Sequence, residues 1–329
     1  MLRQLTRVSS LRNVPRMLTP TISNGSRVYS TSEEKESTEA TAPPAGVRDI
    51  KVQSAASSIS DSESSDGSSS DADRSNRRSN TTYVEEEVNK FRSMASLWWD
   101  VNGDAKPLHS LNRLRMSLIR DGIIQSGFVS PEELDGPMPL TGLKILDVGC
   151  GGGILCEPLA RLGASVVGLD AAEENVAVAR LHADRDPRVR NNVEYICSTV
   201  EEHAESLTNH YDAVVASEVL EHIEATDLFI KTCSDALKPG GSFFITTINK
   251  TAASWLGAII IAEYALRLLP VGTHDWNKFV PRQELLFMLE KNGFVTRLVH
   301  GMAYNPVTNN WCWLAPTSIN YAVHALKAS

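Results

Sequence analysis

Apolar and polar residues follow two different periods from about residue 84 onward. Short apolar runs predict buried strands at 144–149, 165–170, 193–198, 211–217 and 242–248, and two more within 294–303 and 311–326. Between them, apolar residues at helical spacing predict helices at 153–162, 172–184, 201–208, 226–237 and 281–291. Strands alternating with helices are typical of an α/β fold with a doubly wound, mostly parallel sheet, here of seven strands.

Two predicted helices precede the first strand. The stretch YVEEEVNKFRSMASLWWD carries Val84, Val88 and Phe91 at helical spacing, and NRLRMSLIRDGIIQSG predicts a second helix after Gly103 and Pro107. We expect the two to form a helical lid. Trp98 and Trp99 either pack beneath this lid as core residues or reach a ligand, and the sequence leaves both readings open.

The first 82 residues differ from the rest in composition. Residues 1–30 contain five arginines and no acidic residue, which predicts a mitochondrial transit peptide, with a disordered basic tail as the alternative. Residues 31–82 are rich in Ser, Asp and Glu and predict a disordered linker. Residues 83–329 are then expected to form one α/β domain. The net charge of −8 argues against a nucleic-acid partner, and the five cysteines form no C-x-x-C pair.

A glycine-rich turn carries the strongest chemical signal. In LDVGCGGG, Gly149 begins the turn after the first predicted strand, and Asp170 ends the next strand, where an acid can accept hydrogen bonds from ribose hydroxyls. Asp147 at the strand tip would repel a pyrophosphate but suits a cationic amine and sulfonium. The pattern therefore favours S-adenosylmethionine (SAM) over NAD or a purely structural turn.

These motifs resemble the class I methyltransferases and, more closely, the ubiquinone-biosynthesis O-methyltransferase family. The resemblance covers residues 85–324 and rests on the segments WWDVNGDAKPLHSLNRLR, SEVLEH, LKPGG, TINKTAASWLGAIIIAEY, GTHDWNKF and GMAYNPVTN. It implies that Gly149 and Asp170 bind SAM, that Arg115 pairs with the methionine carboxylate, and that Ser217 lines the cofactor pocket through its backbone. Thr199 and Val200 are expected to flank the adenine.

The segment SEVLEH follows a predicted core strand and places Glu218, Glu221 and His222 together. If a helical turn begins there, the three side chains face one point and can bind a divalent metal, which would ionise a catechol. Two alternatives stay open: His222 is a general base that the glutamates orient, or the three form an ordinary polar helix start. Family resemblance suggests Mg²⁺ as the metal, and Glu221 and His222 are the predicted catalytic residues.

An almost uncharged insert, TAASWLGAIIIAEYALRLLP, interrupts the pattern within 250–275. It is too short to span a bilayer. Burial in the core is one reading. A helix lying at the membrane interface is the reading we favour, because the resemblance implies a substrate with a polyprenyl tail.

The resemblance implies an O-methyltransferase that acts on polyprenylated catechols, namely a dihydroxy-polyprenylbenzoate and demethylubiquinol. It also implies a peripheral place on the matrix side of the mitochondrial inner membrane, within a multi-protein complex. The alternatives are a non-catalytic SAM-binding scaffold and a methyltransferase for another lipid-like substrate.

Overall fold

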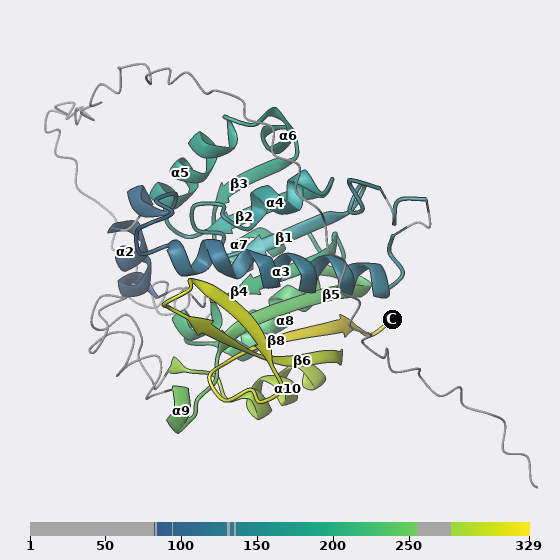
Figure 1. The fold of residues 1–329 in the computed structure, drawn as a ribbon. Coiled ribbons are helices and arrows are strands. Elements are labelled where there is room, and N and C mark those ends of the chain that lie inside the picture. Colours follow the sequence, from purple (N-terminus) through teal and green to yellow (C-terminus); the bar gives the residue numbers. More distant parts are fainter. Residues whose placement is uncertain (1–81, 83, 94, 130–131, 135, 255–277) are drawn as a thin grey trace, which may run out of the picture. The chain divides into compact units, whose positions relative to one another are not determined.

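The computed structural model describes residues 82–329, apart from 83, 94, 130–131, 135 and 255–277 (Figure 1). The predicted transit peptide (1–30), the linker up to residue 81 and most of the apolar insert lie outside the described residues. No helix among the residues that the structure describes is long and apolar enough to cross a membrane.

An eight-stranded sheet forms the centre of the domain, with the order β3-β2-β1-β4-β5-β8-β6-β7. Strands β1 to β5 pair in parallel, and β8 runs antiparallel to both β5 and β6, with β7 antiparallel to β6 at the edge. The strand bounds are β1 Lys144–Val148, β2 Ser165–Asp170, β3 Val193–Cys197, β4 Tyr211–Ser217, β5 Leu237–Ile248, β6 Phe294–Asn305, β7 Asn310–Leu314 and β8 Asn320–Lys327.

Helices cover both faces of the sheet, as a doubly wound fold requires (Figure 1). The described α-helices are α2 Glu85–Ser93, α3 Lys106–Gln125, α4 Cys156–Arg161, α5 Glu173–Ala183, α6 Pro187–Arg190, α7 Val200–Ala204, α8 Thr226–Ala236, α9 Ala252–Ser254 and α10 Arg282–Lys291, and two 3-10 turns are η1 Ala95–Leu97 and η2 Leu220–His222.

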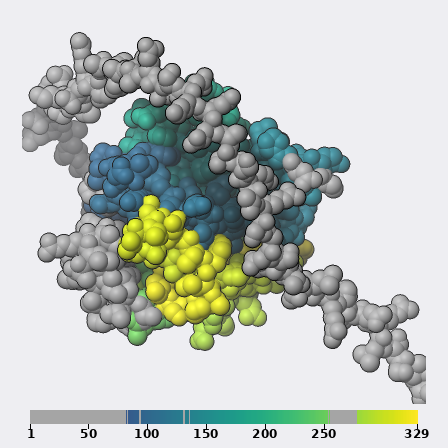
Figure 2. Space-filling view, in the orientation of Figure 1, coloured from purple at the N-terminus to yellow at the C-terminus, as the bar shows by residue number. Residues whose placement is uncertain are grey.

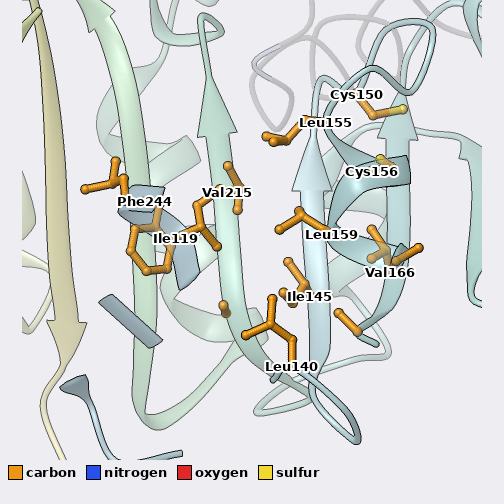
Figure 3. Packing of buried hydrophobic residues seen from close by; sticks show 14 of the residues in the cluster. Ile119, Leu140, Ile145, Cys150, Leu155, Cys156, Leu159, Val166, Val215 and Phe244 are labelled. Atoms are coloured by element: carbon orange, nitrogen blue, oxygen red, sulfur yellow. The ribbon is translucent and has the colours of Figure 1, made fainter. Parts of the chain in front are cut away.

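The two faces are separated by the alternation of side chains along each strand. Ile145, Val215 and Phe244 belong to the cluster that packs against α3, α4 and α5 (Figure 3). Their chain neighbours Leu146 and Val214 belong to the other cluster, which packs against α7, α8 and α10. Because successive residues of a strand point to opposite faces, uninterrupted apolar runs produce a sheet that is buried on both sides.

The sequence misplaced three boundaries. The stretch 311–326 forms two strands, β7 and β8, separated by a turn, so the sheet has eight strands among the described residues instead of seven. Pro107 lies within the first turn of α3, so the second helix begins before Pro107 and not after it, because the first helical positions need no N–H donor. The Pro-Gly-Gly stretch begins β5, with an irregular register at that point, instead of separating a helix from a strand.

The N-terminal segment packs against the C-terminal hairpin. The Trp311 indole N–H on β7 donates to the Pro107 carbonyl (2.9 Å), and Arg113 Nη1 donates to Asn310 Oδ1 (3.2 Å). In Figure 2 the two segments, coloured blue and yellow, adjoin on one face. This packing places α3 across the sheet and brings Arg115 towards the ends of β1 and β4.

Candidate active site

A large cavity of about 580 Å³ opens at the carboxyl ends of the parallel strands. Asp147 near the end of β1, Asp170 at the end of β2 and Ser217 at the end of β4 all line it. Glu218, Glu221 and His222 line the same cavity. This is where ligands bind in open α/β sheets, and the structure therefore brings the predicted cofactor residues and the SEVLEH segment to one place.

Asp170 closes the glycine turn onto the end of β2. Its Oδ2 accepts the Gly151 N–H (2.9 Å), while its Oδ1 accepts the Ala172 N–H (2.9 Å) and the Asn175 side-chain amide (3.0 Å). Burial raises the pKa of Asp170, and these hydrogen bonds oppose the rise. The carboxylate is therefore fixed in place before any ligand arrives.

Gly149 begins the turn with a φ of 71°, a left-handed conformation that favours glycine. A Cβ atom at this position would lie 2.6 Å from Val219 Cγ2 of the SEVLEH segment. The glycine thus lets the turn approach the SEVLEH segment closely, in addition to any room that it leaves for a ligand.

Arg115 and Asp147 form the charged centre of the cavity. Arg115 is fully buried on α3, with Nη1 donating to Ser217 Oγ (3.0 Å) and Nη2 to the Leu108 carbonyl (3.1 Å). Burial raises the pKa of Asp147 to about 6, against a hydrogen bond from the Cys156 thiol and the charge of Arg115. A cationic group of a ligand would relieve the burial cost of this carboxylate.

Trp98 and Trp99 both contact the glycine turn, in line with the packing reading, and contact of either with a ligand stays a prediction. Trp98 lines the cavity, packs over Gly151 and Gly152 where Cβ atoms would clash, and donates to Asn175 Oδ1 (2.8 Å). Asn175 in turn holds Asp170, so Trp98 supports the cofactor end of the cavity through one intermediate residue.

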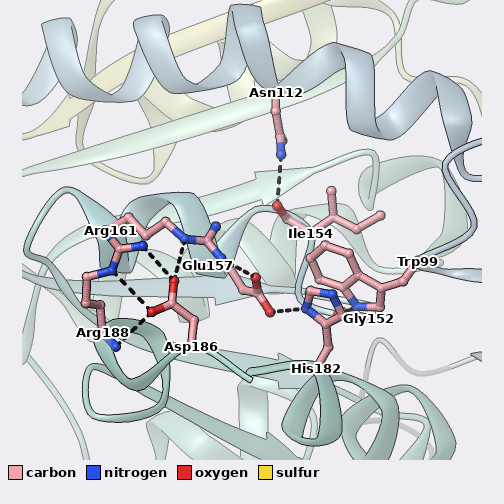
Figure 4. A network of polar contacts seen from close by, with 9 residues as sticks. All are labelled: Trp99, Asn112, Gly152, Ile154, Glu157, Arg161, His182, Asp186 and Arg188. Atoms are coloured by element: carbon pink, nitrogen blue, oxygen red, sulfur yellow. Dashed lines mark hydrogen bonds and ion pairs between the residues drawn. The ribbon is translucent and has the colours of Figure 1, made fainter. Parts of the chain in front are cut away.

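Trp99 contacts the same turn at Gly152 and lies against His182 (Figure 4). Its indole N–H donates to the Gly152 carbonyl (2.8 Å), and its ring stacks on His182 with 3.4 Å between centroids. His182 Nδ1 contacts the buried carboxylate of Glu157 (2.6 Å), which also accepts from Arg161. The glycine turn is therefore clamped from the lid side by a stacked and hydrogen-bonded network.

The SEVLEH segment does not form the predicted helical turn. Glu218 has a φ of 60°, and the following residues form the short 3-10 turn η2. Glu221 is buried, and its Oε2 accepts the Thr247 hydroxyl (2.7 Å). Glu218 Oε1 is buried with no hydrogen-bond partner in the described part of the chain. Burial and then the charge of Glu221 raise the pKa of Glu218 above its ordinary value.

No group of three or more His, Cys, Asp and Glu side chains among the described residues is arranged to hold a metal ion. The cavity contains Glu218, Glu221 and His222, but their side chains do not converge on one point. Thr247 holds Glu221, and a glutamate of helix α2 holds His222. The metal site therefore stays a prediction.

That glutamate is Glu87, which the sequence reading missed. Its Oε2 lies 3.0 Å from His222 Nδ1, and its Oε1 accepts from Lys278 Nζ (2.8 Å). The bond to His222 is the main cause of its pKa of about 2. Glu87 shares a helical face with Val84, Val88 and Phe91, and an acid on an otherwise apolar face was the available signal.

The predicted adenine neighbours also line the cavity. Thr199 and Val200 stand at the start of α7, where Thr199 forms a capping box with Glu202. Together with Gly149, Asp170, Arg115 and Ser217, all the predicted cofactor residues face one space.

Comparison with known proteins agrees with this geometry. Residues 111–299 match the family model described as a methyltransferase domain. The chain is 46% identical to the mitochondrial ubiquinone biosynthesis O-methyltransferase of Rattus norvegicus over 247 residues, which cover 75% of this chain and 70% of that protein. It is 43% identical to the ubiquinone biosynthesis O-methyltransferase of Aliivibrio fischeri over 238 residues, 72% of this chain and 94% of that protein.

Among solved structures, magnesium protoporphyrin IX methyltransferase from Synechocystis PCC 6803 with bound SAM matches with a TM-score of 0.49 and 17% identity. That match covers 75% of this chain and all of that chain. The sequence relatives decide the assignment: this chain belongs to the ubiquinone biosynthesis O-methyltransferase family of SAM-dependent methyltransferases.

Proposed function

We propose that this chain transfers the SAM methyl group to a hydroxyl of polyprenylated catechols in ubiquinone biosynthesis, including dihydroxy-polyprenylbenzoate and demethylubiquinol. One observation carries the proposal. A single cavity joins the charged groups Arg115, Asp147 and Asp170 to a second polar group, Glu221 and His222, on the acceptor side. The names of the relatives support an O-methyltransferase acting in ubiquinone biosynthesis.

The charges at the cofactor end fit the two ionised groups of a methionine moiety. Arg115 would bind the carboxylate and Asp147 the ammonium, with Asp170 accepting from the ribose hydroxyls. Thr199 and Val200 would flank the adenine, Gly149 would let the backbone approach, and the Ser217 backbone would line the pocket. When bound, SAM supplies an electrophilic methyl group on a sulfonium.

The residues at the acceptor end would ionise the substrate. A phenol has a pKa near 10, as the tyrosine side chain does, so its proton must be removed for attack near neutral pH. His222 is the candidate base that takes this proton, and Glu221, which Thr247 holds in the same cavity, is the second proposed catalytic residue. The substrate oxygen then forms the bond to the methyl carbon, and the electron pair of the carbon–sulfur bond stays on sulfur.

The proposal also includes a divalent cation bound at the acceptor end of the cavity. The unpartnered Oε1 of Glu218 and the nearby carboxylate of Glu221 have the donor chemistry that Mg²⁺ prefers. With His222 they would hold the ion, which supplies Lewis acidity towards catechol oxygens. Because the three side chains have not converged in the described structure, this step needs its own test.

The test is methyl transfer from labelled SAM to a short-tailed catechol, with S-adenosylhomocysteine (SAH) binding measured on the same protein. We expect turnover of the catechol. SAH binding without turnover of any hydroxyl acceptor would leave the scaffold alternative. Exhaustive chelation with EDTA should stop turnover and Mg²⁺ should restore it, whereas full activity after chelation would leave His222 as the base without a metal.

Location is proposed from the sequence and the relatives' names. Residues 1–30 should direct a reporter protein to mitochondria, and a full-length protein that stays in the cytosol would contradict this.

The insert within 250–275 is proposed to rest on the matrix side of the inner membrane, so that replacing Ile259, Ile260 and Ile261 with Ser should weaken liposome binding but not SAH binding. Membership of a multi-protein complex is proposed from the family resemblance.

A further inference from the structure

The contact between Glu87 and His222 joins two parts of the chain that lie 135 residues apart. Glu87 lies on α2 of the lid, and His222 ends the η2 turn at the acceptor side of the cavity. Both side chains are largely shielded, at 17% and 18% exposure. Phe91, one turn further along α2, meets the His222 ring edge-on with 4.9 Å between centroids and an interplanar angle of 86°. The lid therefore holds the imidazole both at a ring nitrogen and through a T-shaped aromatic contact.

From this geometry we propose that Glu87 is a positioning residue for the methyl transfer, which holds His222 in the tautomer that leaves its Nε2 lone pair for the ligand. The inference rests on the proposed function. An ionised carboxylate only accepts hydrogen bonds, so the His222 nitrogen beside it, Nδ1, must carry the proton. In a neutral ring the other nitrogen, Nε2, then has the free lone pair. That lone pair is what either role of His222 needs, whether it takes a substrate proton or binds a cation.

Lys278 contacts the second oxygen of the Glu87 carboxylate. Its Nζ donates to Oε1 while His222 engages Oε2, so both carboxylate oxygens serve as acceptors at the same time. Lys278 is the first described residue after 255–277, which contains most of the apolar insert. One side chain of the lid thus connects the acceptor-side turn to the chain that returns from the insert.

A carboxamide cannot meet both demands, and this provides the experiment. Gln at position 87 has one acceptor oxygen and one donor NH₂. If the oxygen faces Lys278, the NH₂ faces His222 and selects the opposite tautomer. If the oxygen faces His222, the NH₂ faces an ammonium group. Removing Lys278 as well frees the carboxamide oxygen to accept from Nδ1, so a second substitution should rescue the first.

Four variants are compared in the full chain: Glu87→Gln, Lys278→Met, the double variant, and Glu86→Gln as a matched control on the exposed side of α2. We expect Glu87→Gln to lower kcat about 10- to 100-fold, the effect typical of removing a residue that orients a functional histidine, with KM and SAH affinity within about twofold of wild type. The double variant should return to within about threefold of wild-type kcat, and Glu86→Gln should be unchanged. The ¹⁵N resonances of the His222 ring, assigned by difference with His222→Ala, should show Nδ1–H in wild type, Lys278→Met, Glu86→Gln and the double variant, and should lose it in Glu87→Gln alone.

Three results would overturn the proposal. The first is wild-type kcat and an unchanged tautomer in Glu87→Gln, and the second is a double variant no better than the single one. The third is a loss that falls equally on SAH affinity, because that would show a merely structural lid contact. If wild type itself fails to methylate the catechol, the proposed function fails, whereas the ¹⁵N tautomer still decides the role of Glu87.

Discussion

The two ends of the cavity are built differently although they share one space. At the cofactor end, the Asp170 carboxylate accepts three hydrogen bonds from the domain itself. At the acceptor end, Glu218 Oε1 has no partner among the described residues, and Glu221 raises its pKa further. A satisfied carboxylate is rigid before binding, whereas an unsatisfied buried one is destabilising until a proton or a cation neutralises it.

The two ends of the cavity also differ in how far apart in the sequence their residues lie. One strand–turn–helix–strand unit contains Asp147, Gly149 and Asp170. Because the unit is short, its local structure fixes the positions of these residues relative to one another. The acceptor end combines residues of the lid, the η2 turn, strand β5 and the segment after 277, represented by Glu87, His222, Thr247 and Lys278. We infer that the cofactor end is preformed by local structure, whereas the acceptor end depends on contacts between segments that lie far apart in the sequence.

Replacing His222 with Ala is the strongest test of this division. If His222 serves only the acceptor end, kcat should fall about 10²- to 10⁴-fold, the contribution typical of a general base, while the SAH dissociation constant changes less than about twofold. Steady-state kinetics and calorimetry on the same preparation measure both. His300→Ala on exposed β6 is the control. A parallel loss of SAH affinity would mean that the two ends are not separable.

Replacing Arg115 with Met should give the opposite pattern. The fully buried guanidinium faces the charges of Asp147 and Glu218, so its loss removes the partner of a ligand carboxylate and leaves acids unbalanced. We expect SAH affinity to fall about 100-fold, since hydrogen bonds to charged groups contribute about 1.5–3 kcal/mol. Arg120→Met is the control, because Arg120 is exposed on α3 and pairs with its neighbour Asp121. Unchanged SAH binding in Arg115→Met, judged by calorimetry, would remove Arg115 from the cofactor site.

The difference between the ends explains what could be predicted from the sequence. The glycine turn, Asp170 and the end of β4 were placed correctly because strand ends in a parallel sheet meet at one edge, and residue order then fixes proximity. The uninterrupted apolar runs predicted buried strands, and the structure accordingly buries Ile145 and Val215 on one face and Leu146 and Val214 on the other. These features depend on local periods, which a single sequence displays directly.

Contacts made across long sequence separations escaped prediction. Nothing in the spacing pairs Glu87 with His222, and Glu85, Glu86 and Glu87 read together as ordinary acids at a helix start. The 3-10 geometry after Glu218 was also missed, because a left-handed φ at a glutamate is set by packing rather than by propensity. The extra strand went unseen because β7 is largely exposed and lacks a buried apolar run.

A pH series sharpens the account of the cofactor end. Burial raises the pKa of Asp147 to about 6 against the hydrogen bond from Cys156 and the charge of Arg115, and the charge of Asp170 adds to the rise. A cationic ammonium binds the ionised form, so below pH 6 the carboxyl must lose a proton when SAH binds. SAH affinity should therefore fall about tenfold per pH unit below 6 and stay level above it. Asp147→Asn should bind weakly with a flat profile, and a flat wild-type profile would show that Asp147 does not contact the cation.

Thr247→Val tests the smallest effect, at the acceptor end. The Thr247 hydroxyl is fully buried on β5 and donates to Glu221 Oε2 at 2.7 Å, and valine keeps the shape of the side chain without the donor. Losing this bond leaves a buried carboxylate oxygen unpaired, which costs about 1–3 kcal/mol of folding free energy. Because Glu221 would remain in place but less firmly held, kcat should fall only severalfold, with SAH affinity unchanged. Thr296→Val, exposed on β6, is the matched control for both denaturant unfolding and kinetics. If Thr247→Val lowers stability but leaves kcat at the wild-type value, Glu221 has no part in the chemistry and belongs to the core, and the acceptor end reduces to Glu218 and His222.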